Sequence, residues 1–234
     1  TGTGGTLVDT DTINITVTAV NDAPVNTVPA TSTATEDVAT AITGISITDV
    51  DAGTANVTVT LTAATGTLNV NTAVGGGVNS GQITNNGTGT VTITAPLANI
   101  NATLANATGL LFTTAVNSTA ATTVTVATSD LGNTGTGGTL VDTDTINITV
   151  TAVNDAPINT VPATATVTED VATAITGISI TDIDAGTANV SVTLTAASGT
   201  LNVNSAVGGG VTSGQITNNG TGTVTITAPL ANIN

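Results

Sequence analysis

Val57-Thr58-Val59-Thr60-Leu61-Thr62 alternates aliphatic side chains with threonine at every position. A period of two is the pattern of a β-strand with one buried and one exposed face. The alternation returns in Ile13–Thr18, Val91–Thr94 and Thr123–Val126, and glycine- and asparagine-rich turns separate these segments. Leu97–Leu111 has spacing that suits one helical turn, but its Asn and Gly residues disfavour a helix. About seven strands per unit predict an all-β fold of the antiparallel β-sandwich type.

The chain repeats itself at an offset of 133 residues. Residues 1–101 align with residues 134–234 without a gap and differ from them at eight positions. A unit of this length can bury its own core, so we predict tandem domains in a window of a longer array. Residues 1–22 would be the C-terminal strand of a preceding repeat, residues 23–155 one complete repeat, and residues 156–234 the N-terminal part of the next repeat.

The amino-acid composition argues against several classes of function. The 234 residues include no Lys, Arg, His or Cys, a single Phe as the only aromatic residue, and a net charge of −15. Without cationic side chains, the chain is not expected to bind nucleic acid or an anionic membrane surface. No segment of the sequence is expected to insert into a membrane, because none would span a bilayer. It offers no thiolate or imidazole for zinc and lacks most catalytic side chains, so we predict that it is not an enzyme. The stretch Gly132–Gly138 has no phosphate-binding lysine and predicts a long flexible loop.

Acidic residues are confined to a few short segments, and residues 52–129 carry no charge. The fifteen carboxylates belong to Asp9, Asp11, Asp22, Glu36, Asp37, Asp49, Asp51, Asp130, Asp142, Asp144, Asp155, Glu169, Asp170, Asp182 and Asp184. Charges that served solubility alone would be spread over exposed strand faces. Two carboxylates ~5 Å apart repel by about 3 kcal/mol at an effective dielectric constant of about 20, which a divalent cation would relieve. Calcium suits such clusters better than magnesium because it accepts about six to eight oxygen ligands in flexible geometry.

The order of the strands predicts where these acids gather, because alternate strand ends return to the same pole of a sandwich. The residues expected together at one pole are Asn21, Asp22, Asp49, Asp51, Asp130, Asp142 and Asp144. Those expected around a cation at the opposite pole are Glu36, Asn154, Asp155, Asp182 and Asp184. The turn Asp49-Val50-Asp51 taken alone has a second interpretation, since an Asp at a turn commonly caps its own backbone.

Four segments carry a family pattern, namely Val20–Pro24, Thr35–Asp37, Thr48–Gly53 and Ala127–Asp130. Together they resemble the bacterial cadherin-like tandem repeats of large calcium-binding surface adhesins and biofilm matrix proteins. The resemblance implies Ca2+ at the junctions between repeats. It implies that the ligands at one junction are Asn21, Asp22, Asp49, Asp51 and Asp130, and that those at the next are Glu36, Asn154, Asp155, Asp182 and Asp184. Ala19 stands where cadherins have an acid. The segment around Asn21 and Asp22, which corresponds to the cadherin linker between domains, is one residue shorter than that linker. About one or two ions per junction are therefore expected. The pattern has no counterpart for four acids, which are extra ligands or plain strand-edge charges: Asp9, Asp11, Asp142 and Asp144.

These features predict a structural extracellular repeat region, a calcium-rigidified stalk or fibre of a bacterial cell-surface adhesin or matrix protein. Its partners would be the neighbouring repeats of the same chain, or identical chains in a fibre. Two alternatives stay open. Threonine-covered strand faces could pair sideways, which would make the chain a subunit of a self-assembling filament with inter-chain strand or lateral contacts. The same threonine arrays could bind carbohydrate or ice, although Thr is also an ordinary residue at exposed strand positions.

Overall fold

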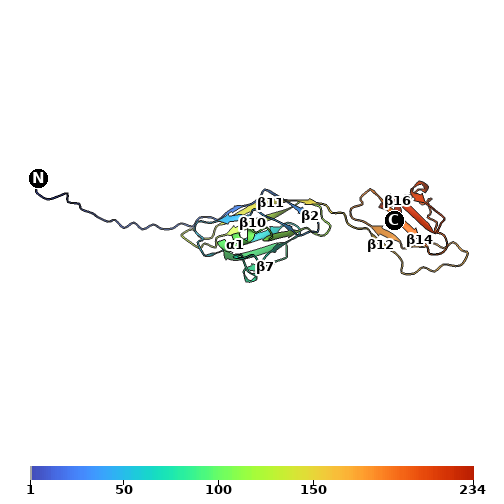
Figure 1. Ribbon diagram of the computed structural model, residues 1–234, viewed down its shortest axis with the longest axis horizontal. Coiled ribbons are helices and arrows are strands. Elements are labelled where there is room, and N and C mark those ends of the chain that lie inside the picture. The colour runs from blue at the N-terminus through green and yellow to red at the C-terminus, as the bar shows by residue number, and fades with distance from the viewer. Residues whose placement is uncertain (1) are drawn as a thin grey trace. The chain divides into compact units, whose positions relative to one another are not determined.

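The computed structural model describes residues 2–234, and the chain divides into two compact units (Figure 1). Unit 1 is Thr1–Ala152 and unit 2 is Val153–Asn234. Unit 1 contains β1 (Val25–Thr27), β2 (Thr31–Thr35), β3 (Thr40–Ala41), β4 (Ser46–Thr48), β5 (Asn56–Ala63), β6 (Thr67–Val70), η1 (Ser80–Gln82), β7 (Ile83–Thr84), β8 (Thr90–Pro96), α1 (Leu97–Leu104), β9 (Leu110–Thr113), β10 (Thr122–Ser129) and β11 (Val141–Thr151). Within residues 2–234, no helix has the length and apolar character needed to cross a membrane.

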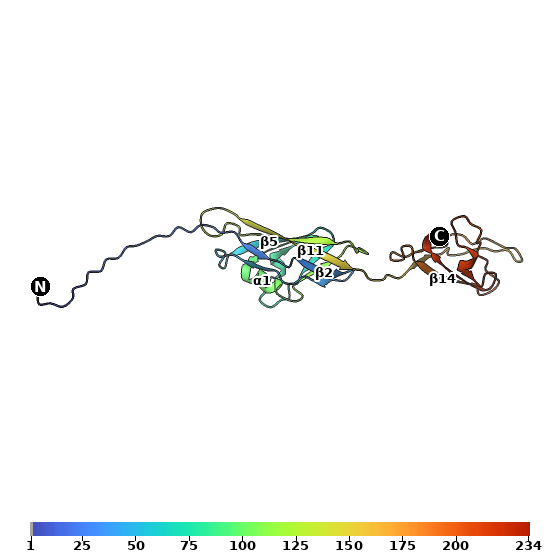
Figure 2. The same ribbon diagram turned by 90° about the horizontal axis from the view of Figure 1, so that it is seen from above.

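Three sheets and one helix of unit 1 share a single apolar core. The largest sheet has six strands in the order β2-β11-β10-β5-β8-β7, the second has the order β3-β9-β6, and β1 pairs with β4. Paired strands run antiparallel, except that β11 and β2 are parallel. The buried apolar side chains of these sheets and of α1 form one contiguous cluster. Figure 2 shows α1 on the side of the unit away from β11.

The period of two decides which side chains this core receives. In β5, Val57, Val59 and Leu61 are fully buried, and the threonines between them lie on the outer face of the sheet. β8 and β10 flank β5 with apolar residues in register with its apolar positions. The predicted all-β class is therefore confirmed. Unit 1 has eleven strands instead of about seven because four of them, β1, β3, β4 and β7, contain only two or three residues.

The helix α1 is longer than the single turn that the sequence suggested. Ile100, Thr103 and Leu104 recur at helical spacing and are buried, so tertiary packing outweighs the weak helix propensity of the segment. Asn101 disfavours a helix by its intrinsic propensity, yet its side chain accepts from the amide of Ile47 at 2.9 Å and donates to the Ile47 carbonyl at 2.7 Å. The asparagine thus joins α1 to β4.

One sequence occurs twice in unit 1 and forms a strand only once. Residues 7–18 and 140–151 are identical. β11 lies between β10 and β2, and its Ile146 is 0% exposed. The equivalent Ile13 is 84% exposed, and residues 7–18 form no regular strand. Since no strand within residues 2–234 pairs with residues 7–18, their assignment to a preceding repeat stays a prediction.

Unit 2 reproduces part of unit 1. It contains β12 (Ile158–Thr160), β13 (Ser179–Thr181), β14 (Asn189–Thr195), η2 (Ser213–Gln215), β15 (Ile216–Thr217), β16 (Thr223–Pro229) and α2 (Leu230–Ile233). These elements surround a smaller core around Val211, Ile216 and Val224. Residues 164–168, equivalent to β2, form no strand. In unit 1, β2 pairs with β11, whose equivalent by the 133-residue offset falls after residue 234.

The repeated sequence allows a matched test of strand burial. Replacing Ile146 by Ala should lower the free energy of unfolding by about 2–5 kcal/mol, because it leaves a cavity beneath β11. The same change at Ile13, in an identical sequence context, should alter it by less than about 0.5 kcal/mol. Urea unfolding followed by far-UV circular dichroism suits this chain, which has no Trp or Tyr. Equal losses in the two variants would contradict the fold.

Candidate metal centre

The structure brings together the five residues predicted for the first junction. They lie at the end of unit 1 where the segment Ala19–Asp22, called the linker below, enters the unit. The segment before β1 supplies Asn21 and Asp22, the turn after β4 supplies Asp49 and Asp51, and Asp130 follows β10. Hydrogen bonds join Asn21 to Asp130 and join Asp22, Asp51 and Asp49 in series, and the peptide bond between Asn21 and Asp22 connects the two sets. Segments separated by up to 109 positions in sequence therefore converge, as the up-and-down ordering of strand ends predicts.

Asn21 and Asp130 form the buried part of this group. The side-chain amide of Asn21 donates to Asp130 Oδ2 at 2.5 Å and to the carbonyl of Gly138 at 2.8 Å. Asp130 Oδ1 accepts from the amides of Gly132 and Leu140, each at 2.8 Å. Asn21 is 6% exposed and Asp130 is 2% exposed, so both side chains are withdrawn from water.

These contacts favour the ionised form of Asp130. Burial raises its pKa, but hydrogen bonds from the amides of Leu140 and Gly132 and from the Asn21 side chain outweigh burial and hold the pKa below the ordinary 3.8. The carboxylate is therefore charged at neutral pH without any basic side chain in the chain. Hydrogen-bond donors replace the missing Lys or Arg.

The Asp49–Asp51 turn forms the partly buried edge of the group. Asp49 Oδ1 accepts from the amides of Asp51 at 2.8 Å and Ala52 at 2.9 Å. This is the backbone cap that the second interpretation of the turn anticipated. Asp51 Oδ2 in turn accepts from the amide of Asp22 at 2.6 Å, which joins the turn to the linker.

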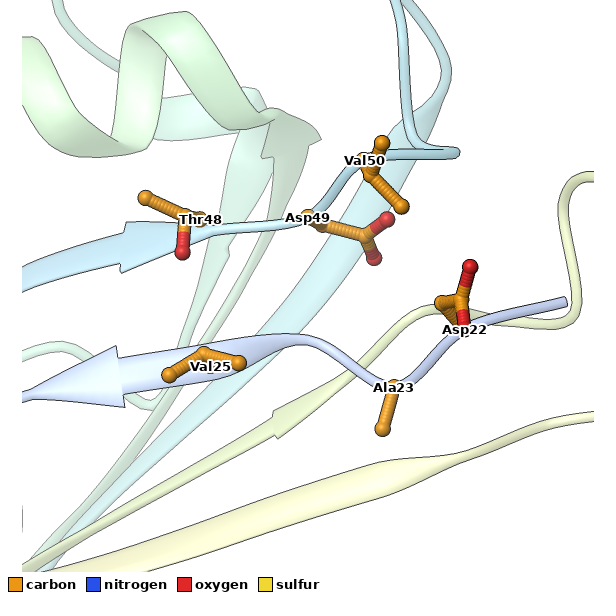
Figure 3. A pocket seen from close by; sticks show the side chains of 6 residues that line it. All are labelled: Asp22, Ala23, Val25, Thr48, Asp49 and Val50. Carbon is orange, nitrogen blue, oxygen red and sulfur yellow. The ribbon is translucent and has the colours of Figure 1, made fainter.

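Two oxygens of the group are buried and accept no hydrogen bond from the protein. They are Asn21 Oδ1 and Asp49 Oδ2. Figure 3 shows the side chains of Asp22 and Asp49 facing the same hollow, which Val25, Thr48 and others also line. Buried acceptors require a donor or a cation, because leaving water without either costs free energy. Backbone capping by Asp49 Oδ1 therefore accounts for one carboxylate oxygen and leaves the other available to a ligand.

Unit 2 repeats the turn but not the buried part. Asp182 Oδ1 accepts from the amides of Asp184 and Ala185, each at 3.0 Å, and Asp184 Oδ2 accepts from the amide of Asp155 at 2.5 Å. Asn154, the equivalent of Asn21, is exposed. The contacts that bury Asn21 come from Asp130 and from the loop at residues 132–138, whose equivalents by the 133-residue offset fall after residue 234.

The second predicted group takes Glu36 from unit 1 and its other members from unit 2, and its assembly stays a prediction. Glu36 directly follows β2 and is 2% exposed, and its amide donates to the Thr151 carbonyl of β11 at 3.0 Å. The adjacent Asp37 was not among the predicted ligands. Its carboxylate accepts from the amide of Asn117 at 3.0 Å, so this acid also holds a turn.

Four acids had two possible roles from the sequence, as extra ligands or as strand-edge charges, and the structure distinguishes one of them, Asp142, by its hydrogen bonds. Asp142 Oδ2 accepts from the amide of Asn26 at 2.7 Å, and the Asn26 side chain donates to the Asp142 carbonyl at 3.1 Å. Thr128 Oγ1 donates to Asn26 Oδ1 at 2.6 Å. Asp142 therefore joins β11 to β1. Asp9 and Asp11 are exposed, and Asp144 is partly exposed on β11.

Sequence reasoning missed the residues that complete the site from the Gly132–Gly138 loop. The Gly138 carbonyl accepts from Asn21, and Thr134 Oγ1 donates to the Asp51 carbonyl at 2.8 Å. Nothing in a run of Gly, Thr and Asn distinguishes such a loop from a flexible one. The only signal in the sequence that this loop lies near the site is its position, because Asp130 is separated from the run by Leu131 alone.

No protein-family model and no curated protein sequence matches this chain. The chemistry of the site therefore follows from its own atoms, which are carboxylate, side-chain amide and backbone carbonyl oxygens. Hard divalent cations bind such oxygens, and calcium tolerates the irregular arrangement that loops provide. Asn21, Asp22, Asp49, Asp51 and Asp130 are the residues that would hold it.

The lowered pKa of Asp130 predicts a loss of stability in acid. Because the folded-state pKa lies below the unfolded value, the contribution is fully present above the unfolded pKa and is lost as pH falls through the folded pKa. With chelator present, the urea midpoint should therefore fall as pH decreases below about 4. Asp130→Asn should reduce this dependence. An unchanged pH profile in the variant would contradict the assignment.

Proposed function

We propose that the chain is a structural extracellular repeat region, a calcium-rigidified stalk or fibre of a bacterial cell-surface adhesin or matrix protein. One observation carries the proposal. Oxygen-bearing residues from the linker, the β4–β5 turn and the end of β10 converge, and two of their buried oxygens have no hydrogen-bond donor. In a chain without Lys, Arg or His, an external cation is the remaining source of positive charge.

The proposed mechanism is mechanical. A cation held by Asn21 and Asp22 on one side and by Asp49, Asp51 and Asp130 on the other would join the linker to unit 1. The ligands meet only in the folded unit, so binding stabilises the fold by mass action. At about 1 mM calcium and a dissociation constant of about 10⁻⁴–10⁻³ M, the gain is about 0.4–1.4 kcal/mol per site.

The finer fold assignment and the cellular location belong to the same proposal. A six-stranded and a three-stranded sheet around one core support a cadherin- or immunoglobulin-like sandwich. The 133-residue repeat supports neighbouring repeats as the partners. Extracellular fluids supply the millimolar calcium that sites of this affinity require, which supports a location outside the cell.

Replacing Asp49 and Asp51 together by Asn tests the site. Asn retains one acceptor oxygen for the turn but removes the charge that would attract calcium. In the parent chain, calcium should raise the melting temperature relative to chelator, and the double variant should lose most of that increase. Thermal melting followed by circular dichroism, with calcium and with chelator, measures this increase in each protein.

The matched control replaces Asp9 and Asp11 by Asn, which changes the net charge equally at exposed positions. This control should keep the full calcium response. A response that persists in the Asp49/Asp51 variant, or disappears in the control, would show that calcium acts elsewhere or only through net charge.

A specific surface favours the second candidate function, a filament subunit with lateral contacts. The outer face of the six-stranded sheet carries no acid, because Asp142 and Asp144 share the inner-facing register of Ile146 and Ile148. Its exposed positions are mainly threonines, and neighbouring strands place Thr58 3.1 Å from Thr94 between their Oγ1 atoms. On this face, two copies of a chain with charge −15 could approach without opposing carboxylates.

Sedimentation velocity separates the two functions. A stalk should remain monomeric over a wide concentration range, whereas a filament subunit should associate as concentration rises. Thr60→Asp together with Thr145→Asp would place like charges on the outer face and should abolish association of that kind. A monomer at every concentration, in the parent chain and variant alike, would exclude lateral assembly through this face.

A further inference from the structure

We infer that the Gly132–Gly138 loop is a docking surface for the chain segment that enters unit 1, and that it holds this segment without a metal ion. Val20 of the entering segment forms a parallel β-bridge with Thr136. The amide of Asn21 donates to the Thr136 carbonyl at 3.0 Å, and the amide of Thr136 donates to the Ala19 carbonyl at 3.0 Å. The loop therefore pairs with the linker as a short strand would.

The approach of the two backbones requires glycine at one position. Gly135 has a φ of +89°, and a Cβ atom there would lie 2.6 Å from both Asn21 N and the Val20 carbonyl carbon. A side chain at position 135 would thus collide with backbone atoms, which cannot rotate away as a flexible side chain can. The glycine allows the linker to lie directly against the loop.

The loop is itself held in place on its other side. Asn133 Nδ2 donates to the Asp130 carbonyl at 2.6 Å and to the Asn56 carbonyl at 2.5 Å. Thr134 Oγ1 donates to the Asp51 carbonyl at 2.8 Å. These bonds anchor the loop to the end of β10 and to the segment between β4 and β5. The docked linker therefore contacts a supported surface, contrary to the flexible loop that the sequence predicted.

The surface recognises an extended backbone followed by asparagine. Ala19 and Val20 are bound through main-chain atoms, so their side chains contribute little to recognition. Asn21 is bound specifically, since its side-chain amide donates to Gly138 as well as to Asp130. Residues 152–154 repeat Ala19–Asn21, and Asn154 is exposed, whereas Asn21 is buried where it contacts the loop.

Beyond calcium binding, part of the linker's direction would then come from a backbone contact within unit 1 that persists when calcium is removed. In the proposed stalk, each unit would hold the segment that enters it through this loop. Calcium would then add to an alignment that already exists.

Amide hydrogen exchange measured by NMR, in excess chelator, tests the docking. In Gly135→Ala, the amides of Asn21 and Thr136 should exchange at least ~10-fold faster, as expected for loss of two backbone hydrogen bonds. Gly87→Ala is the matched control. Its φ of +83° imposes similar backbone strain, but a Cβ atom there meets nothing within 4 Å, so exchange at Asn21 and Thr136 should be unchanged.

Protection of the β10 amides in each variant reports whether unit 1 stays folded. If Gly135→Ala unfolds the unit, Thr136→Pro is used instead, because it removes the Thr136 amide from the bridge in an exposed part of the loop. Accelerated exchange of Asn21 in the folded variant supports docking. Exchange rates equal to those of the control would overturn the inference, and since no calcium is present, they would leave the proposed calcium site untouched.

Discussion

Every carboxylate of this chain must be stabilised without a basic side chain, since Lys, Arg and His are all absent. The structure shows one solution, in which backbone amides serve as the donors. Asp130 accepts two amides and the Asn21 side chain, Asp49 accepts two amides, and Asp142 joins β11 to β1. Asp49 Oδ2 and Asn21 Oδ1 remain without donors. The acids thus organise the loops, and the acceptors left over define where a cation would bind.

Segregation of charge also shapes the rest of unit 1. Strands β5, β8 and β10 carry no acid, and their alternating aliphatic and threonine residues build the core on one side and a neutral face on the other. A core with Phe112 as its only aromatic residue depends on close packing of Val, Ile and Leu. Loops rich in Gly and Asn complete the unit, because they allow close backbone approach and left-handed turns such as Asn85 and Asp37.

The sequence predicted those features that depend on local pattern. Alternation in Val57–Thr62 gave the strand and its buried face, and the order of strand ends gave the convergence of Asn21, Asp22, Asp49, Asp51 and Asp130. Features that depend on tertiary partners were missed. The helix α1 is held by Asn101 and buried Ile100, the parallel pairing of β2 with β11 has no local signal, and the docking loop looks like a flexible one. Residues 7–18 show the limit most directly, since they share the sequence of 140–151 but not its strand.

Stiffening of the proposed stalk requires that calcium binds where the linker enters unit 1. An NMR titration of the amide resonances with calcium, and with magnesium for comparison, measures this at single residues. Saturable shifts at Asp22, Asp51, Ala52 and Gly132, with half-saturation at about 10⁻⁴–10⁻³ M calcium and weaker effects of magnesium, are the predicted result. If these amides do not shift at calcium concentrations up to about 10 mM, while the unit stays folded, the acids serve only as backbone caps and the calcium-rigidified stalk is excluded.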